Sequence, residues 1–281
     1  MTVAIVTDSG SDLTREELIE AGIRQVPLTV SFGEKSYLSP DELSPEEFWR
    51  QATAPGSPFA RTAASSAGQF KQAFERAFED GADGVVCVCI SETLSATVRS
   101  ARMAREMLPD QAIEVVDSRS ASMAIGTLAL HGAAMAAEGA SATEIAEALT
   151  RRRDRSLFYV ALETLEYLRR GGRISGTRAA IGGLLSVKPI MTIENALVVP
   201  ADRPRTRARA RERLIEFMSK RPLEELHVMY SPPIDPAGFR DELLARLPGP
   251  APRLVTAHLI GPVIGAHVGP AAYGGVLVLA E

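Results

Sequence analysis

The segment SAGQFKQAFERAFEDGADGVVCVCI, residues 66–90, decides the fold class because it joins an amphipathic helix to a buried strand. Ser66 and Gln69 have the spacing of a capping box, and Gly81 marks the end of the predicted helix. Residues 85–90 form a short β-rich apolar run, typical of a strand buried on both faces. The apolar side chains on one face of the helix are Phe70, Ala73, Phe74, Ala77 and Phe78.

The alternation of helices and strands extends in both directions from this segment. Before it we predict strands at 3–6 and 26–30, and helices that begin after Thr14 and Ser44. After it we predict a helix near 94–107, a strand at 113–116, an Ala-rich helix ending near Gly139, and a helix capped by Ser141. Such alternation is typical of a parallel sheet covered by helices, an α/β/α domain.

The rhythm changes after Arg155. We predict a strand at 157–161, a helix through Leu168, a hairpin around Glu194 and Asn195, helices at 206–219 and 236–247, and strands at 226–230 and on either side of 261–275. This pattern indicates a mixed sheet. We therefore predict an α/β protein with two domains: a parallel-sheet domain at 1–155 and a mixed-sheet α/β domain at 156–281.

Composition excludes several classes of protein. The chain has 281 residues, 46% hydrophobic and 23% charged, which is the range of an ordinary globular protein. Its net charge of −4 argues against broad nucleic-acid binding. No apolar run is long enough to span a membrane and no leader pattern is present, so we expect a cytoplasmic protein.

The cysteines and histidines show no metal-ligand spacing. Cys87 and Cys89 lie in the predicted strand 85–90 and are expected to be core thiols. The four histidines, His131, His227, His258 and His267, are scattered along the chain. We expect neither a metal nor a cofactor.

The signatures of nucleotide-binding and acyl-transfer enzymes are missing. The sequence contains no G-x-x-x-x-G-K-[ST], G-x-G-x-x-G, G-x-S-x-G or H-E-x-x-H pattern. What it has instead are hydroxyl-rich loops after predicted strands, at 8–12, 62–66, 91–97 and 117–120. Such loops can bind an anion in the crevice at the carboxyl edge of a sheet, or can serve only as turns and caps.

Four strings in order along the chain resemble the DegV family of bacterial fatty-acid-binding proteins. They are VTDSGSDL at 6–13, VDSRSASM at 116–123, LEYLRRGGRIS at 165–175 and GPVIGAHVGP at 261–270. The resemblance implies a two-domain fold with one long-chain fatty acid held between the domains. It also implies that some members carry the acyl chain for a fatty acid kinase, presenting the carboxylate to a separate catalytic subunit.

The same resemblance places the carboxylate-binding hydroxyls of the family on Thr62 and Ser95. Two departures affect their surroundings: Ala63-Ala64-Ser65-Ser66 follows Thr62 without the family's middle Ser and Pro, and Ala96 stands where the family has Gly. Ala271 also replaces a Gly that is common after the last motif. The resemblance therefore identifies the hydroxyls more firmly than the geometry of their loops.

A buried carboxylate needs more than two hydroxyls, so a cation is expected beside it. The candidates are His267, expected in a loop between the last two strands, and Arg170 or Arg173 in the Gly-Gly loop. Each can instead have a purely structural or solvated role. The apolar residues 181–187 can line a tunnel for the acyl chain or belong to the core.

Arginines also crowd one segment, residues 203–213, at every second position. The members exposed to a partner are expected to include Arg205, Arg207 and Arg209. They can form a docking patch for an acidic partner such as the kinase, or a solvated helix paired with acidic neighbours.

The resemblance, together with the missing enzyme signatures, thus implies a non-catalytic protein that binds a long-chain fatty acid and presents its carboxylate to a separate fatty acid kinase in phospholipid metabolism. Transient contact with a membrane surface stays open. The alternatives are a serine-dependent hydrolase or phosphotransferase that uses Ser95 or Ser9 with His267 as base, and a binder of a small phosphorylated metabolite.

Overall fold

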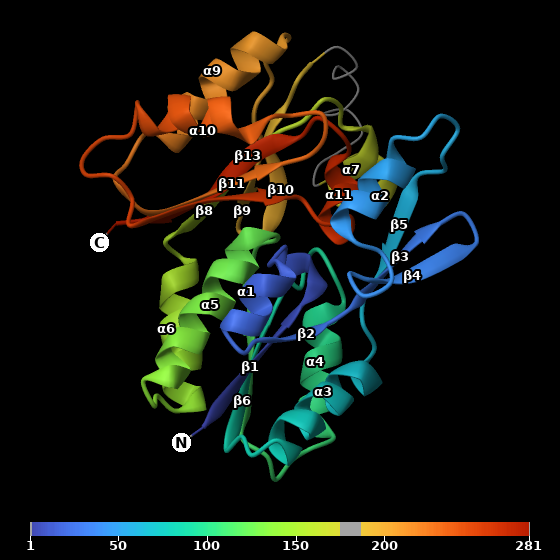
Figure 1. Cartoon of the computed structure of the whole chain (residues 1–281), viewed down its shortest axis with the longest axis vertical. Coiled ribbons are helices and arrows are strands. Elements are labelled where there is room, and N and C mark those ends of the chain that lie inside the picture. Colours follow the sequence, from blue (N-terminus) through green and yellow to red (C-terminus); the bar gives the residue numbers. More distant parts are fainter. Residues whose placement is uncertain (1, 175–186, 281) are drawn as a thin grey trace. The chain divides into compact units, whose positions relative to one another are not determined.

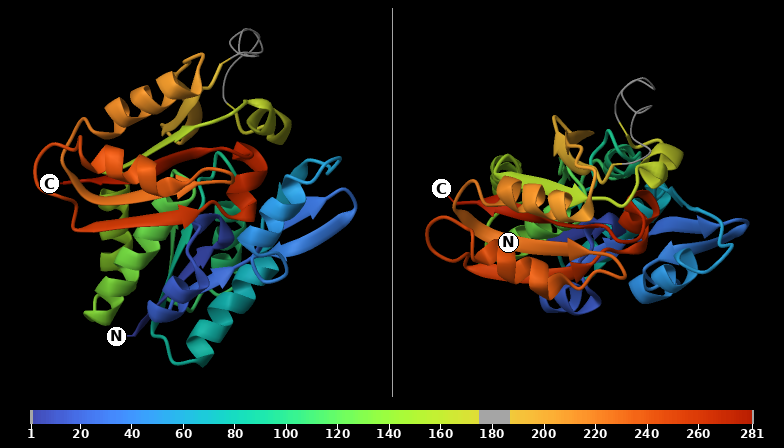
Figure 2. Two further views of the ribbon diagram at one scale, coloured as in Figure 1. Left: turned by 45° about the horizontal axis from the view of Figure 1, so that its top comes forward. Right: turned by 90° about the horizontal axis from the view of Figure 1, so that it is seen from above.

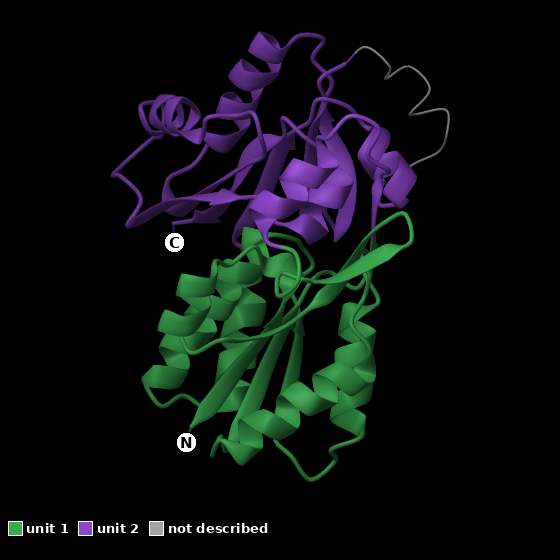
Figure 3. Ribbon diagram, turned by 45° about the vertical axis from the view of Figure 1, so that its right-hand side comes forward, with its two compact units in different colours: residues 1–43, 62–154 green, residues 44–61, 155–281 purple. Residues whose placement is uncertain are grey.

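The computed structural model describes residues 2–174 and 187–280. It confirms an α/β fold with a parallel sheet and a separate mixed sheet (Figures 1 and 2). The chain divides into two compact units, one made of residues 1–43 and 62–154 and the other of residues 44–61 and 155–281 (Figure 3). The segment 44–61 thus packs with the C-terminal half, an excursion that the alternating pattern of the sequence does not indicate.

The first unit is built on a four-stranded sheet in which all neighbours are parallel. Its strands, in the order β2-β1-β6-β7, are Arg24–Val26, Val3–Asp8, Gly84–Cys89 and Ile113–Asp117. Helices α3 (Ala67–Glu79) and α4 (Thr97–Glu106) cover one face, and α5 (Met123–Ala137) and α6 (Ala142–Arg153) cover the other (Figure 1). Cys87 and Cys89 are fully buried in the cluster formed by β6, α3 and α4.

A second, smaller sheet follows because the predicted strand 26–30 is divided at Pro27. Proline has no N–H to donate to a ladder, so β2 ends at Val26 and a new strand starts at Leu28. The strands of this sheet, in the order β4-β3-β5, are Lys35–Ser39, Leu28–Phe32 and Ala60–Ala63. The short elements η1 (Ser9–Ser11) and α1 (Arg15–Glu20) lie between β1 and β2 in the sequence.

The helix starts predicted from caps are confirmed. Helices α1, α2 (Pro45–Ala52), α3 and α6 each begin after a Ser or Thr whose hydroxyl accepts the N–H three residues later. These N-caps are Thr14, Ser44, Ser66 and Ser141. The caps were predictable because they involve only neighbours in the sequence.

The second unit is built on a six-stranded mixed sheet. Its strands, in the order β10-β9-β8-β13-β11-β12, are Leu197–Asp202, Ile190–Glu194, Ser156–Ala161, Tyr273–Leu279, Leu223–Tyr230 and Leu254–Leu259. Strands β11 and β12 are parallel, and the other four pairs are antiparallel. The predicted hairpin is confirmed as β9 and β10, joined by Asn195 and Ala196, both at positive φ. Helices α9 (Arg207–Met218) and α10 (Pro236–Leu244) contribute to its core.

The expectation of a loop between the last two strands is wrong. Residues Pro262–Val268 form helix α11, with Pro262 in its first turn and Gly269, at φ +73°, after its last residue. A β-carbon on Gly265 would lie 2.6 Å from the ring of Phe48, so this glycine lets α11 pack closely on α2. Helix α11 also packs on α7 (Glu166–Gly171).

Candidate functional site

Ser95 lies in the turn that leads from β6 into α4. The turn is closed by Leu94 and Ser95, whose N–H groups both donate to the carbonyl of Ser91, at 2.9 and 3.0 Å. The Ser95 hydroxyl lies 2.7 Å from Thr97 Oγ1, and the N–H of Thr97 donates to it over 3.4 Å. Ser95 is half-buried at the N-terminus of a ten-residue helix, where backbone dipoles favour a negative charge.

Thr62 lies in strand β5, where the sequence led us to expect a loop. It is half-buried between the exposed Arg61 and Ala63. The hydroxyls that follow have structural roles: Ser65 donates to the carbonyl of Pro27 over 2.8 Å, and Ser66 caps α3. Thr62 and Ser95 both belong to the first unit. Their role toward a carboxylate stays a prediction.

The loop after β1 holds the carboxyl edge of the parallel sheet together. Asp8 is fully buried and accepts the N–H of Gly10 at 2.8 Å and of Ile90 at 2.7 Å. Burial raises the pKa of Asp8 to about 6, although both hydrogen bonds act to lower it. Ser9 Oγ accepts the N–H of Leu28 at 2.9 Å, which gives this loop hydroxyl a structural task.

In the second unit, the end of α7 and helix α11 bring Arg173, Gly171 and His267 together. Arg173 donates from Nη1 to the carbonyl of Gly171 over 2.6 Å. Burial, with a smaller contribution from the charge of Arg173, lowers the pKa of His267 to about 4. His267 is therefore neutral at physiological pH. Its role beside a carboxylate, whose negative charge would raise the pKa of the imidazole, stays a prediction.

Arg170 has a different environment from Arg173. Its guanidinium bonds to Glu166 one turn earlier, at 2.7 and 3.0 Å, and lies 3.8 Å from the centre of the Phe59 ring. Phe59 in turn contacts Tyr167, with ring centres 4.9 Å apart. Nothing in the sequence pairs Phe59 with the Gly-Gly motif, because Phe59 reaches it through the excursion 44–61. These contacts orient Arg170, whose side chain is still half exposed.

The arginine-rich segment is largely paired with acidic side chains. Arg207 bonds to Glu163 at 2.9 and 3.0 Å, and Arg209 bonds to Glu212 at 2.6 Å. Arg211 and Arg213 are paired with Glu242 and Asp202, both at 2.7 Å. Arg205, before the start of α9, is exposed. Ion pairing reduces the positive field that six arginines alone would create. Partner docking through Arg205, Arg207 and Arg209 stays a prediction.

Three further expectations from the sequence concern the acyl tunnel, metal sites and membrane-spanning helices. Residues 181–186, most of the proposed tunnel segment, lie outside the described residues. Within the described ranges 2–174 and 187–280, no cluster of three His, Cys, Asp or Glu side chains is arranged to hold a metal ion. No helix in those ranges has the length and apolarity needed to cross a membrane.

The fold and these loops define an α/β protein with hydroxyls at the carboxyl edge of a parallel sheet and a histidine–arginine cluster in a second unit. The chain belongs to the DegV family, since the family model described as "Uncharacterised protein, DegV family" matches residues 2–280. A DegV domain-containing protein of Mycobacterium tuberculosis is 37% identical over 286 residues, covering 98% of this chain and 96% of the relative.

Two solved structures extend the similarity to the whole fold. A DegV family protein from Thermus thermophilus, described by its fatty acid binding, superposes with a TM-score of 0.89 at 32% identity. DegV from Bacillus subtilis, described as a fatty acid binding protein, superposes with a TM-score of 0.87 at 29% identity. Both comparisons cover 100% of each chain.

Proposed function

We propose that this chain binds one long-chain fatty acid, shields its acyl chain, and presents its carboxylate to a separate fatty acid kinase. The observation that carries the proposal is the match, over the full length and at 32% identity, to the Thermus thermophilus protein described by its fatty acid binding. The chain itself acts as a binding protein and kinase subunit rather than as a catalyst.

In this proposal Thr62 and Ser95 donate hydrogen bonds to the carboxylate. Both hydroxyls are half-buried, so an anion bound to them loses part of its hydration and depends on these donors. Ser95 adds the favourable field at the start of α4. Arg173 and His267 are the candidates for the positive charge, since a carboxylate beside His267 would raise the pKa that burial and Arg173 lower.

The acyl chain supplies most of the affinity. Burial of about sixteen carbons at about 0.8 kcal/mol per methylene gives roughly 10 kcal/mol before the entropy of association is subtracted. Such a ligand remains bound during purification.

The proposal is tested by native mass spectrometry of the purified full chain, followed by lipid extraction. We expect a species heavier than the protein by one long-chain fatty acid, and the same fatty acid in the extract. A protein that carries no lipid and takes up no fluorescent fatty acid overturns the proposal.

A further inference from the structure

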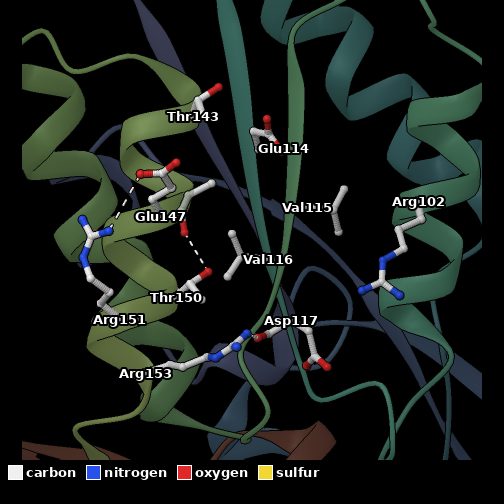
Figure 4. Close-up of a pocket in the computed structure, with 11 residues that line it drawn as sticks. Arg102, Glu114, Val115, Val116, Asp117, Thr143, Glu147, Thr150, Arg151 and Arg153 are labelled. Carbon is white, nitrogen blue, oxygen red and sulfur yellow. Dashed lines mark hydrogen bonds and ion pairs between the residues drawn. The ribbon is translucent and has the colours of Figure 1, made fainter.

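Strand β7 forms one edge of the parallel sheet, and its outer side lies in a groove of about 420 Å³ (Figure 4). Helix α4 contributes Arg102 to one wall, and α6 contributes the other, from Thr143 to Arg153. The groove thus exposes backbone groups that a further strand can pair with.

The hydrogen bonds at the two ends of β7 show which groups these are. Val85 donates its N–H to the carbonyl of Ala112 over 2.8 Å, and Ser118 donates to the carbonyl of Cys89 over 3.1 Å. Residues 112, 114, 116 and 118 therefore turn their backbone groups toward β6, and residues 113, 115 and 117 turn theirs outward.

Arg153 confirms this direction, because its Nη1 donates to the outward carbonyl of Asp117 over 2.8 Å. That contact covers one carbonyl of the edge. The N–H and the carbonyl of Val115, at the middle of the strand, also face the groove. Among the described residues, neither group has a hydrogen-bond partner comparable to Arg153.

The charges that line the groove are equal in number and opposite in sign. Three arginines and three carboxylates line it: Arg102, Arg151 and Arg153, and Glu114, Asp117 and Glu147. A partner of one sign does not match such a surface, whereas a second copy of it does.

We infer that the β7 edge is a self-association surface, on which a second copy of this chain pairs its own β7 antiparallel about Val115. Each Val115 then donates its N–H to the other copy's Val115 carbonyl, and Glu114 lies opposite the second copy's Val116. This register uses the outward groups and leaves the ladder to β6 intact.

The same register pairs opposite charges. Val115 packs with the α3–α4 side of the sheet, so Glu114 and Val116 face α6. Val116, Arg151 and Arg153 line the same groove, with both arginines at the end of α6 (Figure 4). Glu114 of one copy, placed opposite Val116 of the other, therefore lies beside Arg151 and Arg153 of that other copy. Arg151 is available for this contact because its side chain is 72% exposed and lies 3.8 Å from Glu147. Within the described residues, the side-chain carboxylate of Glu114 forms no hydrogen bond or ion pair that would compete.

The test is sedimentation of the full chain over a concentration series with four variants. Wild type should shift toward twice the monomer mass as concentration rises. Glu114→Arg should weaken the dimer at least about tenfold, because it faces Arg151 with a like charge. Combining it with Arg151→Glu should restore dimerisation, and Glu79→Lys, on the exposed side of α3, should have no effect.

Val115→Pro, the fourth variant, removes the outward N–H at the centre of the pairing and no ladder bond to β6, and should abolish the dimer. Circular dichroism checks its folding, and the charge-swap pair decides the outcome if it unfolds. A weak dimer with a Kd of about 1 μM would be almost fully formed at about 100 μM protein. A wild type that is still monomeric at about 100 μM therefore overturns the inference. So does a dimer that none of the groove variants weakens.

Discussion

Gly171 lies so close to the imidazole of His267 that a β-carbon at position 171 would come within 2.2 Å of Nδ1. The glycine is thus required for space at the junction of α7 and α11. A residue of the Gly-Gly motif acts here through packing against the last motif of the chain, almost a hundred residues later.

Gly171→Ala should therefore destabilise the protein by about 1 to 3 kcal/mol, because the helices must separate or the ring must turn. Chemical denaturation measures the change. Gly68→Ala is the matched control, since a β-carbon there meets only Ser66 Oγ at 3.9 Å. Equal stabilities for both variants would show that the α7–α11 contact can adjust freely.

Thr62→Ala and Ser95→Ala should each weaken fatty-acid binding by about 1 to 3 kcal/mol, because each removes a donor to a buried anion. Displacement of a fluorescent fatty acid measures the affinity. Ser66→Ala provides the comparison: it removes the cap of α3 and should reduce stability by about 1 kcal/mol without changing affinity. Unchanged affinity in both hydroxyl variants removes Thr62 and Ser95 from the head-group site.

The lowered pKa of His267 predicts acid sensitivity. The imidazole of His267 takes up a proton near pH 6.5 in the unfolded chain and only near pH 4 in the folded chain. The neutral imidazole therefore makes its full contribution to the free energy of unfolding above pH 6.5, and this contribution is lost as the pH falls to about 4. The loss is at most about 3 kcal/mol.

Asp8 acts in the opposite direction, because its raised folded pKa, about 6, makes the protein more stable as pH falls from there toward 3.8. The difference in unfolding free energy between wild type and His267→Gln, followed from pH 7 to pH 4, cancels the Asp8 contribution. Parallel curves for the two proteins would contradict the buried, neutral imidazole.

The purified chain, supplied with ATP, magnesium and fatty acid, should form no acyl phosphate, because no phosphate-binding pattern is present in its sequence. Addition of a fatty acid kinase catalytic subunit should produce it. Chromatography of the reaction products reports the outcome, and acyl phosphate made by the chain alone would establish it as an enzyme.

Replacement of Arg205, Arg207 and Arg209 together by Gln should slow association with that kinase and reduce its salt dependence, since exposed charges act mainly on the rate of encounter. Stopped-flow mixing at several salt concentrations measures both. Arg240→Gln, in a surface pair with Asp241, is the control. A triple variant that loses lipid binding but associates normally places these arginines in the ligand site instead.

Local signals in the sequence predicted local structure well. The N-caps and the β9–β10 hairpin depend on residues within a few positions of each other, and the structure confirms them. The alternation of helix and strand was enough to predict the parallel sheet. Ser95 lies in the hydroxyl-rich loop predicted at 91–97, but the helix predicted near 94–107 begins only at Thr97.

Helix α11 and the environment of Arg170 depend on contacts between distant segments. Helix propensity is poor in the run 263–268, because it contains three β-branched residues, Val263, Ile264 and Val268, and one glycine, Gly265. Packing of Gly265 on Phe48 and of Gly269 on Tyr167 favours the helix regardless. Because those partners come from the excursion 44–61 and from α7, no pattern within the run itself indicates them.

The excursion 44–61 makes the chain pass from one unit to the other three times, at 43/44, 61/62 and 154/155. Phe48 and Trp49 are almost fully buried in the second unit, where Trp49 Nε1 donates to the carbonyl of Ile260 over 2.7 Å. After a cut near residue 155, the N-terminal fragment would expose Phe48 and Trp49, whose packing partners lie in the C-terminal fragment. The C-terminal fragment would lack α2, the helix that packs on α11. Limited proteolysis or gene dissection at that point therefore cannot produce two halves that each fold alone. During synthesis, the second unit can fold completely only after its last strand, β13, has been translated, long after residues 44–61.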